Sequence, residues 1–485
     1  MFLKAMLRGA GVLLPIFSLP APHGVGDMGP AAYRFVDFLK EAGQTYWQLL
    51  PLHPVLAEYD NSPYSSTSSF AGEPAYISLE LLAERGLVKR PLAELPRGRA
   101  DYEAARAYKM KALAEVEKPG DLDDFVGRNE WLEDYALYVA LREHFGRPWV
   151  EWPRELRDRD PAALRRWREK LRGRVELEYK LQYFFWEQWH ELKRYANSQG
   201  VFLIGDLPIY PSLDSADVWA HRELFKLDEE GRPKYVAGVP PDYFSPTGQL
   251  WGNPVYDWDA MRAEGFKWWL DRLKHALSAF DYVRLDHFRG YAAYWEVPAG
   301  ETTAVNGRWV PAPGAELLDR ARSELGELKL IAEDLGYITP DVIELRDRFG
   351  LPGMRVLQFA WDGNPANEHK PHNHVKNSVV YTGTHDNNTI VGWFFHEATP
   401  RARREALEYM GKRSAKDINW AFIRLAYSSV AEAAVVPLQD FLGLGPEARI
   451  NKPGTRGGNW VWRLAELPGR DLARRIRRLA RLYGR

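Results

Sequence analysis

The stretch Tyr282-Val283-Arg284-Leu285-Asp286-His287 decides the fold, because it is a short apolar run that ends in a carboxylate. Seven further short apolar runs occur along the 485-residue chain, and helical stretches separate most of them. Alternation of short strands with helices is typical of a parallel sheet, and eight such strands close a barrel. We therefore predict an α/β protein with a (β/α)8 TIM-barrel fold. Its strands are expected near residues 12–17, 46–52, 201–207, 282–285, 328–332, 354–359, 378–382 and 433–438.

Apolar spacing also predicts helices between these strands, for example over residues 31–41 and 266–277. A last helix over residues 472–482 would complete the ring. The interval between the second and third strands is too long for one helix, so we expect residues 72–175 to form a helical insertion, with helices near 130–145 and 162–171. Residues 210–257 are rich in proline and glycine and predict long loops over the barrel mouth. We treat residues 1–485 as one catalytic barrel domain that contains both insertions.

The overall composition narrows the class of ligand. Lys and Arg total 65 against 66 Asp and Glu, so the formal net charge is −1. The chain therefore has no excess of positive charge that would favour binding to nucleic acid or to an anionic membrane. The chain has no cysteine, which excludes disulfides and thiolate chemistry and fits a cytoplasmic protein. Residues 12–17 could belong to a signal peptide, but nearby prolines favour a buried first strand. No other stretch approaches the roughly 20 apolar residues of a membrane span.

Four of the apolar runs end in a carboxylate, at Asp206, Asp286, Glu333 and Asp386. Catalytic groups of β/α barrels come from the C-terminal ends of the strands, so we expect these four on one rim. A single polar residue at a strand end would mean little. Several carboxylates packed together shift one another's pKa values, which is a cost usually tolerated for chemistry. Two carboxyls flanking one bond suit glycoside chemistry, and a third can stabilise the positive charge of the transition state.

Successive side chains of a strand point to opposite faces, and this alternation indicates which residues share a face with the acids. Arg284 and Asp286 lie on the same face, so the guanidinium can hold Asp286 ionised and oriented, as a nucleophile requires. Asp334 should point away from the side that Glu333 faces, and we choose Glu333 because it comes first at the strand end.

Two histidines and many aromatic residues extend the candidate site. His287 and His385 each adjoin a strand-end acid and can donate hydrogen bonds to sugar hydroxyls. We expect no metal there, because ligand spacing of the zinc type is absent from the sequence. The chain has 19 Trp, 24 Tyr and 21 Phe, and the composition alone leaves open whether they pack the core or stack on sugar rings.

An ordered set of segments resembles the 4-α-glucanotransferases, also called amylomaltases or disproportionating enzymes. The resemblance includes Arg284-Leu285-Asp286-His287-Phe288-Arg289-Gly290 and Thr384-His385-Asp386-Asn387-Asn388. It runs from about residue 10 to Trp462 and also covers residues 62–66, 205–210, 214–219, 248–254, 331–336, 451–454 and 458–460.

The resemblance implies roles for the acids at the strand ends. Asp286 would be the nucleophile that forms a β-linked glucosyl-enzyme. Glu333 would be the general acid and then the general base, and Asp386 would stabilise the transition state. Asp206 and Arg284 would support the substrate and the nucleophile.

The resemblance also implies sugar contacts around these acids. Trp251 would face the acceptor side, and Tyr64 and Ser62 the donor side, although loop packing is the alternative for Trp251 and Tyr64. A loop that holds Tyr243, Phe244 and Trp251 is expected to exclude water. The other residues expected to bind substrate are His287, His385, Gln249 and Asp242.

We therefore expect a retaining 4-α-glucanotransferase that acts on maltooligosaccharides and on starch- or glycogen-derived glucans. No cofactor, calcium or other metal is expected, and neither nucleic acid nor membrane as a partner. The alternatives are an α-amylase-like retaining hydrolase with the same carboxylates and an inactive glycan-binding barrel.

Overall fold

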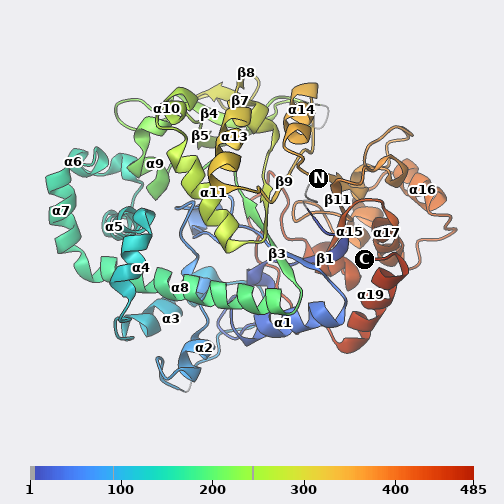
Figure 1. Ribbon diagram of the computed structural model, residues 1–485, viewed down its shortest axis with the longest axis horizontal. Helices are drawn as coiled ribbons and strands as arrows, with labels where there is room; N and C mark the ends of the chain where they lie inside the picture. Colours follow the sequence, from blue (N-terminus) through green and yellow to red (C-terminus); the bar gives the residue numbers. More distant parts are fainter. Residues whose placement is uncertain (1–5, 91, 243–244) are drawn as a thin grey trace.

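The computed structural model describes residues 6–90, 92–242 and 245–485, and Figure 1 shows helices around the central strands, such as β1, β3 and β9. Eight parallel strands follow the order β10-β11-β12-β1-β2-β3-β6-β9. The Ala332 N–H donates to the Pro352 carbonyl at 2.9 Å and so links the two ends of this order. The (β/α)8 prediction is confirmed. The strands are β1 Gly9–Leu13, β2 Tyr46–Gln48, β3 Phe202–Leu207, β6 Tyr282–Leu285, β9 Leu330–Ala332, β10 Gly353–Val356, β11 Ser378–Tyr381 and β12 Ala433–Pro437.

All eight predicted strands are present, but five of them end earlier than predicted, β1, β2 and β10 by three or four residues and β11 and β12 by one. Ile16–Ser18 and Leu357–Phe359 are 3-10 turns, because their backbone groups lie beyond the neighbouring strands that could pair with them. The barrel interior is filled by side chains such as Ile204, Met354 and Tyr381, which are fully buried. The barrel is therefore a packed core, and the free strand ends are the place for a site.

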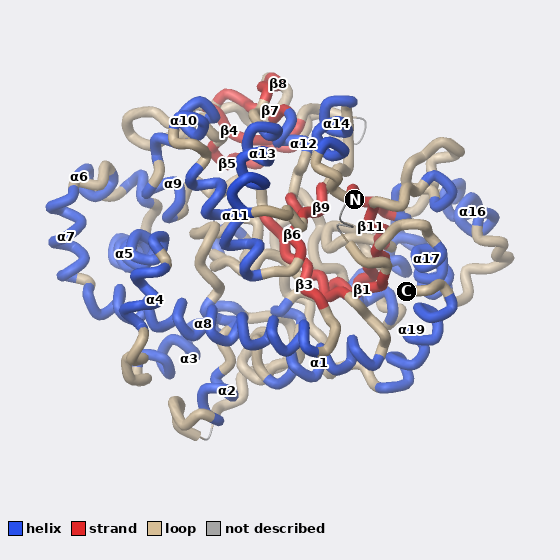
Figure 2. The backbone as a smooth tube through the Cα atoms, viewed as in Figure 1, coloured by secondary structure: helices blue, strands red, loops and turns tan. Residues whose placement is uncertain are grey.

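Helices cover the outside of the barrel. The predicted first and last helices are α1 Pro30–Glu41 and α19 Arg470–Leu482, which contact each other and so join the two ends of the chain's helical ring (Figures 1 and 2). Both bury one apolar stripe, as helices on a barrel require. The other α-helices that follow β3 along the chain are α9 Ala216–Ala220, α10 Trp258–Ala263, α11 Lys267–Ala279, α12 Arg289–Ala292, α13 Gly314–Leu325, α14 Pro340–Arg348, α15 Ile390–Gly392, α16 Pro400–Tyr409, α17 Ile418–Ser428 and α18 Leu438–Phe441.

A group of helices lies between β2 and β3, and the two helices predicted there are confirmed as α5 and α7. The longest, α8, has 27 residues and leads directly into β3. A buried ion pair of 2.9 Å between Lys109 and Asp27 ties this group to the loop after β1. The helices are α2 Leu79–Glu84, α3 Tyr102–Ala114, α4 Leu122–Arg128, α5 Glu130–Phe145, α6 Arg154–Arg157, α7 Pro161–Lys170 and α8 Arg172–Ser198. The subdomain boundary at residue 175 stays a prediction, since α8 continues through it.

The interpretation of residues 210–257 as loops is wrong in one respect, because they supply two strands of a second sheet. This antiparallel sheet has the order β5-β4-β7-β8. Its strands are β4 Tyr235–Val239, β5 Gln249–Pro254, β7 Ala293–Pro298 and β8 Arg308–Pro311. β4 pairs with β7, which follows nearly sixty residues later in the chain, and such a distant partner leaves no local signal. Within the described ranges, no helix is long and apolar enough to cross a membrane.

Candidate active site

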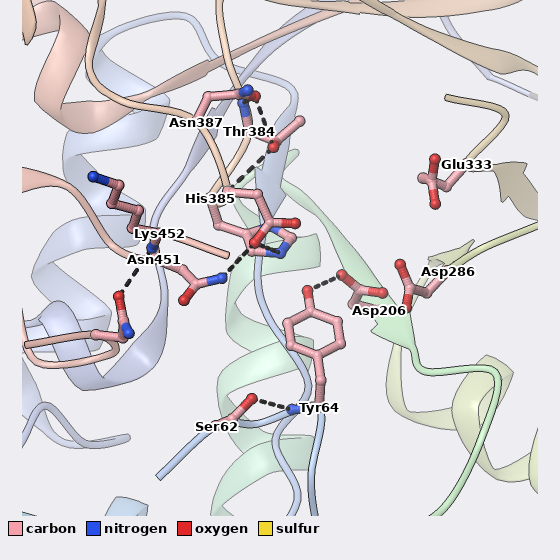
Figure 3. A network of polar contacts seen from close by, with 12 residues as sticks. Ser62, Tyr64, Asp206, Asp286, Glu333, Thr384, His385, Asn387, Asn451 and Lys452 are labelled. Atoms are coloured by element: carbon pink, nitrogen blue, oxygen red, sulfur yellow. Dashed lines mark hydrogen bonds and ion pairs between the residues drawn. The ribbon is translucent and has the colours of Figure 1, made fainter. Parts of the chain in front are cut away.

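The strand-end carboxylates lie at the C-terminal ends of the barrel strands, and Figure 3 shows Asp206, Asp286 and Glu333 near one another. Asp206 belongs to β3, Asp286 follows β6 directly, Glu333 follows β9, and Asp386 lies in the loop after β11. β3 and β6 are adjacent, and Arg284 pairs with Asp206 in their register. The topology therefore brings three of the acids to one place because their strands are neighbours.

The Arg284 guanidinium connects these three acids. Its Nη1 donates to both oxygens of Asp206 at 2.9 Å and to Oδ1 of Asp286 at 3.1 Å. Its Nη2 lies 3.9 Å from Oε2 of Glu333. The Arg284 side chain is only 5% exposed, so water screens these interactions little. The guanidinium thus fixes the Asp286 carboxylate and offsets part of the negative charge around it.

Glu333 is held by two backbone groups in a buried place. Its Oε2 accepts from the His287 N–H at 2.8 Å, and its Oε1 accepts from the Leu335 N–H at 2.9 Å. Burial raises the pKa of Glu333 to about 8, the nearby Arg284 charge lowers it and the Asp286 charge raises it further. At neutral pH the carboxyl is therefore protonated and able to give a proton.

Asp334 faces a different part of the fold. It accepts from the Met354 N–H at 2.8 Å and from Nη1 of Arg346 at 2.7 Å, and it is buried. This carboxylate anchors the start of β10 and α14. Of the two consecutive acids, Glu333 is the one beside Arg284.

Tyr64 connects Asp206 to the other side of the site. Its hydroxyl donates to Oδ2 of Asp206 at 2.7 Å, as Figure 3 shows, and its ring stacks on His385 with centroids 5.1 Å apart. Trp460 lies beside both rings, with centroids 5.7 Å from Tyr64 and 6.0 Å from His385. These three rings form an aromatic cluster in which Tyr64 and His385 are nearly parallel and Trp460 is tilted against them by 45° and 37°. His385 and Trp460 are buried.

Asp386 is fixed by its neighbours on this second side. Its Oδ1 lies 3.3 Å from Nε2 of His385 and accepts from Nδ2 of Asn451 at 2.7 Å. The Asp386 side chain is 43% exposed, so it remains open to a ligand.

His287 has an unusual backbone that serves the site. Its φ of 49° lies in the left-handed region, and this turn directs its N–H to Glu333. Burial lowers the pKa of the His287 ring to about 4, although Asp286 opposes the effect, so the ring is neutral. The ring meets Trp251 edge to face, with centroids 4.7 Å apart. Strand β5 thereby brings Trp251 beside His287, and the Trp251 indole donates to Gln249 at 3.2 Å.

Comparison with known proteins identifies the family. The sequence profile described as 4-alpha-glucanotransferase matches residues 14–468. The chain belongs to the 4-alpha-glucanotransferase family. It is 48% identical to the 4-alpha-glucanotransferase of Aquifex aeolicus over 99% of this chain and 100% of that one. It is 50% identical to the 4-alpha-glucanotransferase of Thermus thermophilus, over 95% of each chain.

Solved structures agree with the family assignment. Amylomaltase from Streptococcus agalactiae, solved in complex with acarbose, has a TM-score of 0.94 and 38% identity, over 99% of both chains. Amylomaltase from Corynebacterium glutamicum shares the fold, with a TM-score of 0.78 over 99% of this chain and 75% of that one. The predicted activity, 4-α-glucanotransferase, is confirmed by the family. The two alternatives, an α-amylase-like hydrolase and an inactive glycan-binding barrel, are therefore not supported.

Ser62 and Asp242, which are predicted to bind substrate, form hydrogen bonds with residues close to them in the chain. Ser62 accepts from the Tyr64 N–H at 3.3 Å and so supports the turn that presents the Tyr64 ring. Asp242 accepts from the Ser245 N–H at 2.7 Å in the turn before β5. Tyr243 and Phe244, expected to exclude water, lie outside the described residues.

Asn451 and Trp460 belong to segments that resemble the 4-α-glucanotransferases, but the sequence predicts no individual site role for either residue. Asn451 contacts an acid 65 positions away in the chain, so no spacing rule would connect them. The only sequence signal for these two residues was the family-like ending over residues 451–460.

Proposed function

We propose that the protein transfers 1,4-α-glucan segments from a maltodextrin to the 4-hydroxyl of glucose or another glucan by double displacement. Asp286 is the nucleophile, and Glu333 is the general acid and then the general base. The observation that carries this assignment is the shared Arg284 guanidinium, which lies 3.1 Å from Asp286 and 3.9 Å from Glu333. One carboxyl is paired and oriented, and the other is buried with a raised pKa, as nucleophile and acid require.

In the first half of the reaction, Glu333 protonates the glycosidic oxygen and Asp286 attacks the anomeric carbon. The bond to the leaving oxygen breaks, the reducing-end part of the donor departs with the proton, and an ester joins the glucan to Asp286. The carboxyl of Glu333 is left ionised.

In the second half, the 4-hydroxyl of an acceptor loses its proton to Glu333 and attacks the same carbon, which releases Asp286. The ester carries no charge, so the Asp286 contribution that raises the pKa of Glu333 is absent in the intermediate. The pKa of Glu333 then falls, which suits the group to act as a base. The same pair of acids thus changes roles without a conformational change.

Asp386 is proposed to stabilise the positive charge that develops on the sugar ring, and Asp206 to hold Arg284 in place. The Tyr64–His385–Trp460 cluster is proposed to receive the donor sugar, and Trp251 with His287 to receive the acceptor. Gln249 and Asp242 contribute from the β4–β5 segment. A bound acceptor between these rings would leave water little access to the ester.

The ligands are proposed to be neutral α-glucans. The Streptococcus agalactiae relative was solved with acarbose, and 38% identity over 99% of both chains supports binding of the same compound here. Action in the cytoplasm rests on the cysteine-free sequence.

A trapping experiment with the Glu333→Gln variant tests the two roles. With α-maltotriosyl fluoride as donor, the leaving group needs no proton, so the first half proceeds and the second is slow. Mass spectrometry of a proteolytic digest should then find one maltotriosyl unit on the peptide that contains Asp286. Added azide, which needs no general base, should release an α-glycosyl azide. A label on another acid, or a β-product, contradicts the assignment.

A second assay separates transfer from hydrolysis. Maltotriose should give glucose and longer dextrins while the total number of reducing ends stays constant. A rise in reducing ends at the rate of glucose release would contradict transfer.

A further inference from the structure

The loop that carries Asp386 is closed into a ring by side chains that lie behind the site. Asp386 and Asn388 are two positions apart in this loop. Nδ2 of Asn388 donates to Oε1 of Glu397 at 2.9 Å, and the same oxygen accepts from Nη1 of Arg449 at 2.8 Å. Nη2 of Arg449 returns to the Asp386 carbonyl at 2.7 Å. The ring therefore begins and ends at the backbone of the proposed transition-state stabiliser.

An uncommon helical turn puts Glu397 in this position. Trp393–Glu397, labelled η8, is a π-helical turn that follows α15, and the Ala398 N–H bonds to the Trp393 carbonyl at 2.8 Å. Such wide turns are rare and occur often at functional sites. A Cβ on Gly392 would lie 2.2 Å from Oδ1 of Asn388, so glycine leaves the room that the Asn388 side chain needs.

Arg449 also reaches the second support of Asp386. Its Nε donates to the Asn451 carbonyl at 2.8 Å, and the Asn451 side chain donates to the Asp386 carboxylate at 2.7 Å. One guanidinium thus holds the Asp386 backbone directly and the residue that holds its carboxylate. The Arg449 side chain is 16% exposed, and Glu397 is its carboxylate partner.

We propose that Arg449 and Glu397 are positioning residues for Asp386, a role that rests on the proposed function of that acid. Neither residue touches the reacting atoms. Glu397 fixes the guanidinium, the guanidinium fixes the Asp386 carbonyl and Asn451, and these two set where the carboxylate lies. Because Asp386 is 43% exposed and is held by few contacts, loss of the ring would let it move. A displacement of about 1 Å in a catalytic group costs on the order of 10²-fold in rate.

The decisive variant is Arg449→Met, which keeps the length of the side chain and removes all three donors. We expect kcat with maltotriose to fall by about 10²-fold, while KM changes by less than roughly threefold. Arg449→Lys keeps the charge and should recover about tenfold of the loss. Glu397→Gln should lower kcat in the same direction but less, because the Arg449 bonds to the two carbonyls persist.

Arg222→Met is a matched control. Arg222 also bridges a carboxylate and a carbonyl, at 2.7 Å from Asp158 and 2.7 Å from the Glu229 oxygen, and its side chain is 21% exposed. Loss of this bridge should lower the melting temperature as much as Arg449→Met does and leave kcat unchanged. If both variants lose stability and neither loses kcat, Arg449 is a stabilising residue only and the proposal is overturned.

A double-mutant cycle shows whether the effect passes through Asp386. Measured with α-maltotriosyl fluoride, Arg449→Met should cost about 10²-fold alone and almost nothing in the Asp386→Asn background. Additive losses would overturn the positioning role while leaving the proposed function of Asp386 intact. An Asp386→Asn variant with undiminished kcat would instead overturn that proposed function. The two failures are therefore distinguishable.

Discussion

Replacing Asp286 by Asn should lower the pKa of Glu333 and so change the protonation state of the proposed general acid before any substrate binds. The pKa of Glu333 is about 8 because of burial first and the Asp286 charge second, with Arg284 opposing both. Asn has nearly the shape of Asp and can still accept from Arg284. The substitution therefore removes one charge while the burial of Glu333 is retained.

The size of the effect follows from Coulomb's law. Retaining glycosidases place their two carboxyls about 5–5.5 Å apart, and at an effective dielectric constant of about 20 a unit charge at that distance contributes about 3 kcal/mol. This energy corresponds to a pKa change of about 2. The Asp286 and Glu333 side chains are 27% and 12% exposed, so solvent screens the interaction only in part. The pKa of Glu333 in the variant should lie near 6, within about one pKa unit.

Carbon-13 NMR of protein labelled at the Glu side-chain carboxyl measures this value, and the resonance is assigned by its loss in Glu333→Gln. The matched control is Asp259→Asn, which removes an acid whose side chain is 96% exposed and should leave the pKa of Glu333 unchanged. An unchanged or raised pKa in Asp286→Asn would refute the reasoning, because it would mean that the two acids do not share one electrostatic site.

For the unaltered protein, kcat/KM with maltotriose should fall about tenfold per pH unit above a pKa near 8, because the general acid Glu333 then loses its proton; a pH–rate profile tests this. The free energy of unfolding should also depend on pH. Folding raises the pKa of Glu333 from 4.5 to about 8, so between these values the folded state keeps a proton that the unfolded state has lost. The folded state therefore loses stability as pH rises from about 5 to 8. Glu333→Gln lacks this loss, so thermal denaturation should show its melting temperature, relative to the parent protein, increasing over that interval. Tyr64→Phe removes the 2.7 Å hydrogen bond to Asp206 and should cost about 1.5–3 kcal/mol, seen as a 10- to 100-fold lower kcat/KM. Trp251→Ala opens the acceptor side next to His287 and should raise the ratio of hydrolysis to transfer by roughly 3- to 10-fold, counted as reducing ends released per glucose formed.

The barrel could be predicted from the sequence because its signal is local. Each strand is a short apolar run, and the β6 prediction, Tyr282–Leu285, matches the structure at both ends. The acids at the strand ends follow from the same pattern, since the fold itself gathers the C-terminal ends of parallel strands. The second sheet could not be found this way: four residues of β5 are exposed, so they carry no apolar alternation, and β4 depends on a distant partner.

The ring of hydrogen bonds behind Asp386 is a second feature that could not be predicted from the sequence. Arg449 is one of many arginines in a charged chain, and nothing in its neighbourhood marks it out. Its proposed role depends on three contacts, to Glu397, Asn451 and the Asp386 carbonyl, each set by how loops fold at the rim. Sequence patterns predict periodic structure well and supporting contacts between loops poorly.

The sequence shows which acids belong to the site, but it does not show which of them carry a charge. Asp206 accepts three hydrogen bonds, two from Arg284 and one from Tyr64. Burial raises the pKa of Asp206, and the Arg284 charge opposes this by favouring the ionised form. With Glu333 protonated, three acids of the site remain, Asp206, Asp286 and Asp386, and the Arg284 guanidinium pairs with the first two of them. These acids outnumber the guanidinium, and in the proposed mechanism the positive charge that develops on the sugar ring offsets part of this excess. Four acids in a sequence cannot reveal this imbalance, because burial, which decides that Glu333 stays neutral, is a property of the folded chain.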